Sequence, residues 1–143
     1  MIIDGKKIAR EIIEELKTSY EVEDLGPYEL NPEDDYPKYT LKVAKKVAEN
    51  PESEGILICR SGIGVSIAAN KVKGCYAALC FTKQHAEKAR EHNNANVLCL
   101  DADYTGDDPL EITKTFLSTN FAGWDSRHGR RVKEVLDIEA GKL

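Results

Sequence analysis

Residues 55–71 decide the fold: Gly-Ile-Leu-Ile-Cys-Arg-Ser-Gly-Ile-Gly-Val-Ser-Ile-Ala-Ala-Asn-Lys. The apolar run 56–58 is typical of a strand buried on both faces, and Cys59 falls at its carboxyl end. Residues 61–64 form a tight loop with two glycines, and a helix is predicted from Val65. Ligands of open parallel sheets bind at the carboxyl ends of the strands, so a site is expected here.

The loop after Cys59 can serve two kinds of chemistry. A glycine-rich loop before a helix presents backbone N–H groups that can hold a phosphate or an oxyanion. The same surroundings favour a thiolate over a thiol. Free cysteine is more often a small buried apolar residue, and this segment alone leaves both interpretations open. The loop lacks the Gly-Lys-Ser/Thr of a Walker A motif, and Ile67 stands where a dinucleotide fingerprint needs a third glycine.

Length and composition set modest limits. The chain has 143 residues, which predicts a single domain over 1–143. Its net charge of −5 argues against a general nucleic-acid surface. No apolar stretch approaches the roughly 20 residues that span a membrane, and the start lacks a signal-peptide layout, so a cytoplasmic protein is expected. The four cysteines form no CxxC pair, which argues against a disulfide framework or a zinc site.

Periodicity predicts an alternation of helices and strands. It indicates a single Rossmann-like α/β domain with a parallel sheet of about five strands and helices on both faces. An acidic stretch over 28–35 is expected to be a solvated loop. The predicted helices span 6–18, 37–48, from 65 onward, 83–92, 109–119 and 127–139, and the strands span 20–25, 56–59, 75–81 and 96–100.

A first polar cluster, Arg-Glu-His-Asn-Asn at 90–94, lies between a predicted helix and a predicted strand. Asparagine is common at helix ends, so this cluster could simply terminate the helix. His92 would stand next to the strand 96–100, and histidine is the usual proton carrier near neutral pH.

A second cluster, Ser-Arg-His-Gly-Arg-Arg at 126–131, opens the last helix with three arginines and a histidine. Cations are disfavoured at the positive end of a helix, so this arrangement makes sense if an anion binds there. Arg127 and Arg131 are four residues apart and share a helix face, a spacing suited to one phosphate. A solvated basic surface, or pairing with the acidic residues farther along the helix, is an equally weighted alternative.

These segments together resemble the RpiB/LacA/LacB family of sugar-phosphate isomerases. The resemblance rests on ordered blocks across 35–132: Asp-Tyr-Pro-Lys-Tyr at 35–39, Gly-Ile-Leu-Ile-Cys and Ser-Gly-Ile-Gly within 55–64, Ser-Ile-Ala-Ala-Asn-Lys at 66–71, Ala-Arg-Glu-His-Asn-Asn-Ala-Asn-Val at 89–97, and Arg-His with Arg-Val within 127–132.

The resemblance implies an aldose–ketose isomerase that uses neither a metal nor a cofactor and converts ribose 5-phosphate to ribulose 5-phosphate through an enediolate. Such a reaction needs a base, donors for the oxyanion, a ring-opening group and a phosphate clamp. It further implies a homodimer with each active site between two subunits, and leaves both a dimer and a tetramer of two such dimers open. By analogy the catalytic residues are Cys59 as base, Ser61 and His92, and the substrate-binding residues are Tyr39, Gly62, Gly64, Asn93, Arg127, His128 and Arg131.

The chain departs from the family pattern at several positions. Ile2 and Ile3 stand where members carry an Asp-His pair, so the resemblance implies that the first strand of the family sheet is short or missing here. Asp103 stands where members usually have an arginine. Arg60 replaces a glycine beside Cys59, where it could lower the pKa of the thiol, supply a phosphate contact or block the pocket. A catalytically weak member, acting as a sugar-phosphate-binding or partner-dependent subunit, is therefore the alternative to an active isomerase.

Overall fold

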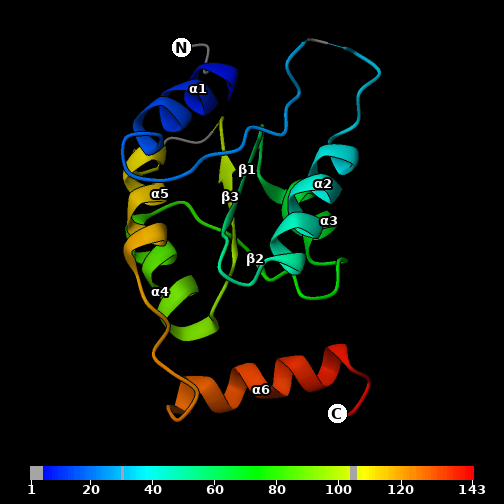
Figure 1. Ribbon diagram of the computed structural model, residues 1–143, viewed down its shortest axis with the longest axis vertical. Coiled ribbons are helices and arrows are strands. Elements are labelled where there is room, and N and C mark those ends of the chain that lie inside the picture. Colours follow the sequence, from blue (N-terminus) through cyan, green and yellow to red (C-terminus); the bar gives the residue numbers. More distant parts are fainter. Residues whose placement is uncertain (1–4, 30, 104–105) are drawn as a thin grey trace.

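The computed structural model describes residues 5–29, 31–103 and 106–143; Ile2 and Ile3 lie outside the described residues. Six helices and three strands make up this part of the chain, and they alternate from α2 to α5 (Figure 1). They are α1 (Gly5–Leu16), α2 (Tyr36–Glu49), β1 (Gly55–Cys59), α3 (Ile63–Ala69), β2 (Ala77–Leu79), α4 (Lys83–Asn93), β3 (Val97–Asp101), α5 (Pro109–Ser118) and α6 (Arg127–Glu139).

The strands form a parallel sheet in the order β1-β3-β2. In the register of β1 with β3, Gly55 lies opposite Val97 and Cys59 lies opposite Asp101. The residues of β3 from 97 to 100 are all buried, as expected for a central strand whose two faces are covered. The sheet therefore has its carboxyl edge at Cys59 and Asp101.

Helices cover both faces of the sheet, which confirms the predicted architecture. Helices α1, α4 and α5 pack on one face around Leu98, Leu100 and Phe116, and α2 and α3 pack on the other around Leu57 and Cys99. In Figure 1 these two layers flank the strands, while α6 crosses the opposite end of the molecule from α1 and contacts α4. The core thus has two layers that meet at the sheet.

The prediction of about five strands is not met within the described residues, which contain three. Residues 21–29 form neither helix nor strand, so the predicted strand over 20–25 is wrong. Val22 alone of this stretch packs against the core, while Glu21, Glu23 and Asp24 are exposed. Short apolar patterns of this kind become strands only where a neighbouring strand supplies hydrogen bonds.

Two asparagines from the family-like blocks have structural roles. The side chain of Asn70 both accepts from Ala77 N and donates to Ala77 O, each at 2.9 Å, which joins α3 to the start of β2. The side chain of Asn96 accepts from Tyr76 N at 2.7 Å and donates to Gly74 O at 2.9 Å. These bonds satisfy the backbone where β2 begins.

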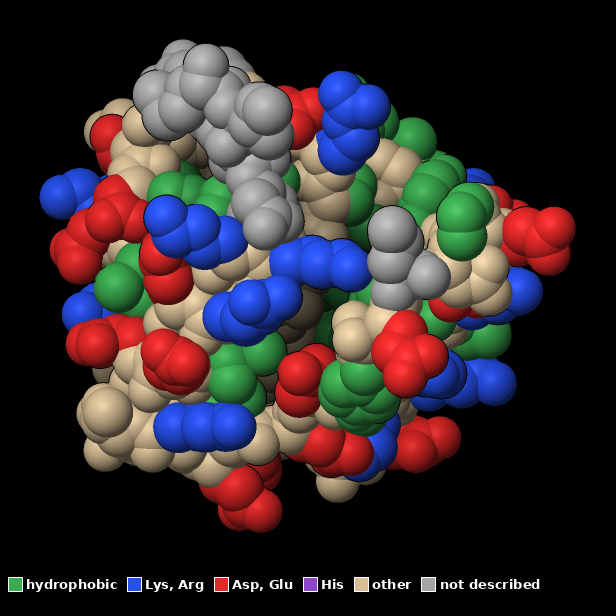
Figure 2. Space-filling model, turned by 90° about the horizontal axis from the view of Figure 1, so that it is seen from above, with side chains coloured by type: hydrophobic (Ala, Val, Ile, Leu, Met, Phe, Trp, Pro, Cys, Tyr) green, Lys and Arg blue, Asp and Glu red, His purple; other side chains and the backbone are tan. Residues whose placement is uncertain are grey.

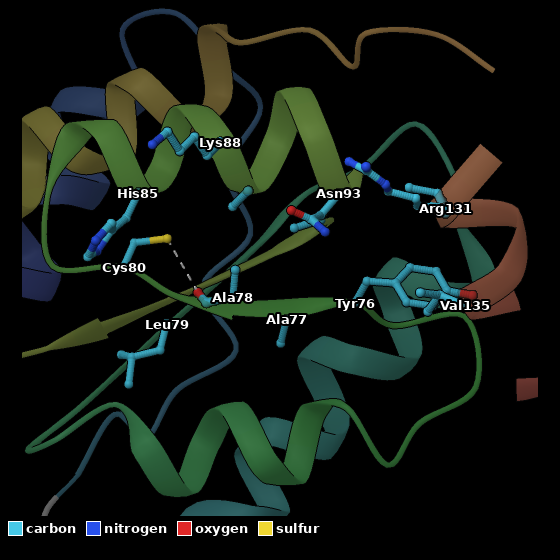
Figure 3. A pocket seen from close by; sticks show the side chains of 13 residues that line it. Tyr76, Ala77, Ala78, Leu79, Cys80, His85, Lys88, Asn93, Arg131 and Val135 are labelled. Atoms are coloured by element: carbon cyan, nitrogen blue, oxygen red, sulfur yellow. Dashed lines mark hydrogen bonds between the residues drawn. The ribbon is translucent and has the colours of Figure 1, made fainter. Parts of the chain in front are cut away.

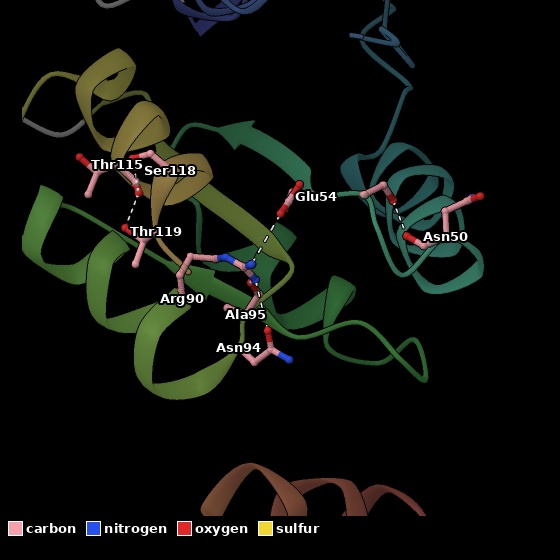
Figure 4. A network of polar contacts seen from close by, with 9 residues as sticks. Asn50, Glu54, Arg90, Asn94, Ala95, Thr115, Ser118 and Thr119 are labelled. Atoms are coloured by element: carbon pink, nitrogen blue, oxygen red, sulfur yellow. Dashed lines mark hydrogen bonds and ion pairs between the residues drawn. The ribbon is translucent and has the colours of Figure 1, made fainter. Parts of the chain in front are cut away.

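A buried arginine fixes the end of α4 against the start of the sheet (Figure 4). Arg90 donates through Nη1 to Ala95 O, just before β3, and its Nη2 lies 3.6 Å from Glu54 Oε1, just before β1. The Arg90 side chain is only 14% exposed, and its guanidinium lies 5.5 Å from the centre of the Phe116 ring. Arg90 therefore positions the segment that carries His92 and Asn93.

Replacing Arg90 is expected to destabilise the fold. In Arg90→Ala the carbonyl of Ala95 loses a charged donor and the cation no longer covers Phe116, so the free energy of unfolding should fall by about 2–3 kcal/mol. Urea denaturation followed by circular dichroism measures this change. Glu54→Gln, which removes only the more exposed partner, is the matched control and should cost less than half as much; equal losses would contradict the role given to Arg90.

Candidate active site

Cys59 ends β1 at the carboxyl edge of the sheet, where the sequence predicted it. Its side chain is partly exposed, and its Sγ accepts a hydrogen bond from Gly62 N at 3.1 Å. Ser61 is exposed, and its Oγ accepts from Ile63 N at 3.3 Å. The sulfur is thus both accessible and in direct contact with a backbone amide. The loop thus has the features expected of a reactive cysteine.

Glycines are required in this loop by close packing. Gly62 has φ +71°, and a Cβ added there would lie 2.4 Å from Leu79 Cδ1 and 3.1 Å from the backbone of Leu100. A Cβ on Gly64 would lie 2.6 Å from the ring of Tyr36. Both residues therefore let the loop approach the core, and Gly62 also gives the backbone conformation that directs its amide at Cys59.

The other three cysteines differ from Cys59. Cys75, Cys80 and Cys99 are buried. Burial raises the pKa of Cys75 and of Cys80 to about 11, with Glu139 adding to the effect at Cys75. Burial also raises the pKa of Cys99. These three thiols stay protonated at neutral pH, which leaves Cys59 as the accessible thiol of the chain.

The two polar clusters meet at the other end of the molecule. The imidazole rings of His92 and His128 stack with their centres 3.9 Å apart and their planes 4° apart. Glu91 Oε2 lies 3.4 Å from His92 Nε2. Burial lowers the pKa of His128, and His92, Arg127 and Arg131 lower it further, while Glu91 acts in the opposite direction. The stacked pair favours a state in which at least one ring is neutral.

The arginines at the start of α6 are not neutralised by the rest of the described chain. Among the described residues no carboxylate forms an ion pair with Arg127, Arg130 or Arg131. Glu139, a possible partner, instead accepts from Tyr76 OH at 2.8 Å and from Gly74 N at 3.0 Å. Ion pairs with the carboxylates of α6 therefore do not account for these arginines, and an anion remains a suitable ligand for them.

Cys59 and His92 lie at opposite ends of the sheet. Asn96 O accepts from Gly55 N, so the segment after His92 joins the beginning of β1, whereas Cys59 ends it. Five strand residues rise about 13 Å. Figure 2 views the molecule from above, and no described histidine is visible on that face. One chain therefore does not bring the predicted base together with the predicted ring-opening and phosphate-binding groups.

Tyr39 lies on α2, which packs against α3, the helix that follows the Cys59 loop. We therefore group Tyr39 with Cys59. Its hydroxyl donates to Asp34 Oδ2 at 2.7 Å, and Lys42 Nζ lies 5.0 Å from its ring centre. The hydrogen bond to Asp34 raises the pKa of Tyr39. The phenol is therefore held as a neutral donor, and it is oriented toward Asp34.

A groove of about 520 Å³ runs along the free edge of β2 between α4 and α6 (Figure 3). Asn93 and Arg131, both predicted site residues, line it, together with His85, Lys88 and Val135. Its floor is the backbone and small side chains of β2, which pairs with β3 on one side only among the described strands. The sequence did not predict this groove, because it depends on β2 being an edge strand.

The structure also joins two residues that the sequence treated separately. Arg60 Nε lies 2.9 Å from Asp103 Oδ2, so the two departures from the family pattern form an ion pair beside Cys59. The residues are 43 apart in the chain. Only the register of β1 with β3 brings them together.

Among the described residues, no three His, Cys, Asp or Glu side chains are grouped closely enough to hold a metal ion. None of the helices in the described ranges has the length and apolar character to cross a membrane.

Fold and site place the chain in the class of α/β proteins that carry polar side-chain clusters at the ends of a parallel sheet. The chain belongs to the ribose/galactose isomerase family, whose model matches residues 4–135. This match confirms the family resemblance and the isomerase class predicted from the sequence.

Relatives support the assignment in sequence and in structure. A probable ribose-5-phosphate isomerase B of Mycoplasma genitalium is 44% identical over 138 residues, which are 94% of this chain and 90% of that protein. Its crystal structure with bound ribulose-5-phosphate has a TM-score of 0.89 and covers 95% and 90% of the two chains. Ribose-5-phosphate isomerase B of Clostridium thermocellum is 42% identical, with a TM-score of 0.88 and coverage of 97% and 93%.

Substituting Gly62 is expected to disturb Cys59. In Gly62→Ala the Cβ meets Leu79 and Leu100, so the loop must shift and its amide must leave the sulfur. Alkylation of Cys59 by iodoacetamide at neutral pH should slow several-fold, and the free energy of unfolding should fall by about 2–3 kcal/mol. Gly141→Ala is the control, because Gly141 has the same φ of +71° with nothing within 4 Å of an added Cβ. If both variants behave alike, backbone strain alone explains the glycine.

The His92–His128 stack predicts a low pKa for His128. An NMR titration of its imidazole should give a midpoint below the usual 6.5, and His92→Asn should raise that midpoint. A lowered pKa means that the unfolded chain takes up the proton more readily. Stability should therefore fall as the pH drops below about 6.5, and it should fall less in His128→Asn. A midpoint above 6.5 would refute the assignment.

Proposed function

We propose that the protein interconverts ribose 5-phosphate and ribulose 5-phosphate, acting as a single isomerase domain over 1–143 in the cytoplasm. The observation that carries this proposal is the pairing of an accessible, amide-contacted Cys59 with a separate His-Arg cluster, in a chain related to ribose-5-phosphate isomerases B. The bound ribulose-5-phosphate of the Mycoplasma genitalium protein identifies the sugar phosphate to test first. No contact in the described residues favours the non-catalytic alternative.

Cys59 is the proposed base. As a thiolate it takes the proton from C2 of the open-chain aldose and returns it to C1, so that an enediolate forms and is consumed without net change in protons. Backbone amides of the loop with Gly62 and Gly64 stabilise the developing oxyanion, and Ser61 moves a proton between O1 and O2. Tyr39 holds the sugar from α2. The reaction uses only the groups of the protein and the substrate.

The second cluster supplies the remaining functions. His92 opens the sugar ring by proton transfer, and the ring of His128 stacks against its imidazole. Asn93 binds sugar hydroxyls. Arg127, His128 and Arg131 hold the phosphate, because guanidinium groups match its oxygens and no described carboxylate competes for them.

The separation of the two clusters requires a second copy of the chain. If two copies meet along the free edge of β2 through a twofold axis perpendicular to the strands, their strands run antiparallel, and the Cys59 end of one faces the His92 end of the other. The groove contains Asn93 and Arg131, and α3 presents Ile63 and Ile67 with 54% and 57% exposure. Apolar helix residues of this exposure suit an interface. We therefore propose a homodimer with two shared sites.

The assay follows ribulose 5-phosphate formation from ribose 5-phosphate with EDTA present. Wild type should turn over, and Cys59→Ala should lose at least about 10³-fold in kcat, because the base that starts proton transfer is gone. Cys75→Ala is the matched control and should retain turnover if it folds, because Cys75 is buried away from the loop. A wild type without turnover would reject the proposed activity.

Mixing two inactive variants tests the shared site. Cys59→Ala and His92→Asn are each inactive alone, but after mixing and exchange about half of the dimers are mixed, and each of these has one intact site. The mixture should recover about a quarter of the wild-type activity. Recovery at the level of background would show that Cys59 and His92 of the same chain act together, contrary to the proposal.

A further inference from the structure

Arg60 and Asp103 are fixed just beyond the carboxyl ends of neighbouring strands. Asp103 N donates to Arg60 O at 3.0 Å, and Ala102 N donates to Cys59 O at 2.9 Å. Asp103 N also donates to Asp101 Oδ1 at 2.7 Å. These backbone bonds extend the β1–β3 ladder past the strands and hold Arg60 directly next to the proposed base.

The ion pair occupies only part of the guanidinium. Arg60 contacts Asp103 Oδ2 through Nε, and no other described residue forms an ion pair with Arg60. The Arg60 side chain is 91% exposed. A guanidinium has five N–H donors in a planar fork, so Nε can hold a carboxylate while the terminal amino groups bind an oxyanion.

Stability does not explain the pair. An ion pair this exposed contributes little to the free energy of folding. The charges have a clearer effect on a ligand, since a lone Asp103 would repel a phosphate near Cys59. With Arg60 attached, that repulsion is cancelled and the donor groups of the guanidinium are added. In Figure 2 the centre of this face is hollowed, and Lys and Arg side chains gather beside the hollow.

We propose that Arg60 is a further substrate-binding residue, which contacts the phosphate of the sugar phosphate at the rim of the Cys59 site. Asp103 is its positioning residue and fixes the guanidinium through Nε. The phosphate then lies between Arg60 of one subunit and the Arg127–Arg131 cluster of the other. This inference rests on the proposed function, because it places a phosphorylated sugar at Cys59.

The test compares the KM for ribose 5-phosphate and the inhibition constant for inorganic phosphate among variants. Arg60→Ala should raise both by about tenfold with kcat within about twofold, because a charged hydrogen bond to phosphate is lost. Arg60→Lys should give a KM and an inhibition constant between those of wild type and of Arg60→Ala. Arg10→Ala, an exposed arginine on α1, is the matched control and should match wild type.

A second pair of variants tests the role of Asp103. Asp103→Asn alone should raise KM slightly, because the guanidinium loses its anchor. In the Arg60→Ala background the same change should lower KM, because it removes an unpaired carboxylate. This reversal of sign is not expected of residues that merely stabilise the loop.

Two results would overturn the inference. One is an Arg60→Ala protein whose KM and phosphate inhibition equal those of Arg10→Ala. The other is a lower kcat with a shifted pH profile at unchanged KM, which would mean that Arg60 acts on the thiol. If wild type does not isomerise ribose 5-phosphate, a separate measurement tests the phosphate contact of Arg60: whether inorganic phosphate protects Cys59 from alkylation by iodoacetamide. Protection that is weaker in Arg60→Ala supports the contact, and a wild type without protection rejects it.

Discussion

The parallel pairing of β3 with both of its neighbours is the constraint on which the rest of the structure depends. It puts every strand end at one edge and every strand start at the other. Cys59 belongs to the first edge because it ends β1, and His92 belongs to the second because it precedes β3. No change of loop conformation can bring these two residues together without breaking the sheet. The distance between the two clusters is therefore a property of the topology, and a site that uses both has to recruit another chain.

Much of this arrangement could be predicted from the sequence. Helical spacing and buried apolar runs predicted the helices and three of the strands, because these signals are local. The strand predicted over 20–25 does not form, and the reason lies outside its own residues. Among the described elements, β1 lies at the edge of the sheet and no other strand pairs with it there. Val22 packs on the core, but one apolar contact does not replace a ladder of backbone hydrogen bonds.

The sequence predicts which residue types form the candidate site, but it predicts few of the contacts that they make. The residue types at Cys59, His92 and Arg131 indicate chemistry from the sequence alone, and the structure adds the Gly62 amide at Cys59, the His128 ring at His92 and the groove lined by Arg131. The ion pair of Arg60 with Asp103 could not be foreseen, because it joins residues 43 apart through the register of two strands. Conversely, Asn70 and Asn96 occur within the family-like blocks, yet their side chains bind backbone atoms at the start of β2. A matched motif therefore mixes residues for chemistry with residues for folding.

The first turns of α6 show how an acidic protein can still offer a site suited to a dianion. The net charge is −5, yet Arg127 and Arg131 stand at the positive end of a helix without a described carboxylate as partner. Glu139, at the far end of α6, is held by Tyr76 and Gly74 and cannot reach them. Repulsion among these cations also helps to lower the pKa of His128. A phosphate at this turn would remove that repulsion. Because the repulsion is present only in the free chain, its relief favours the binding of an anion.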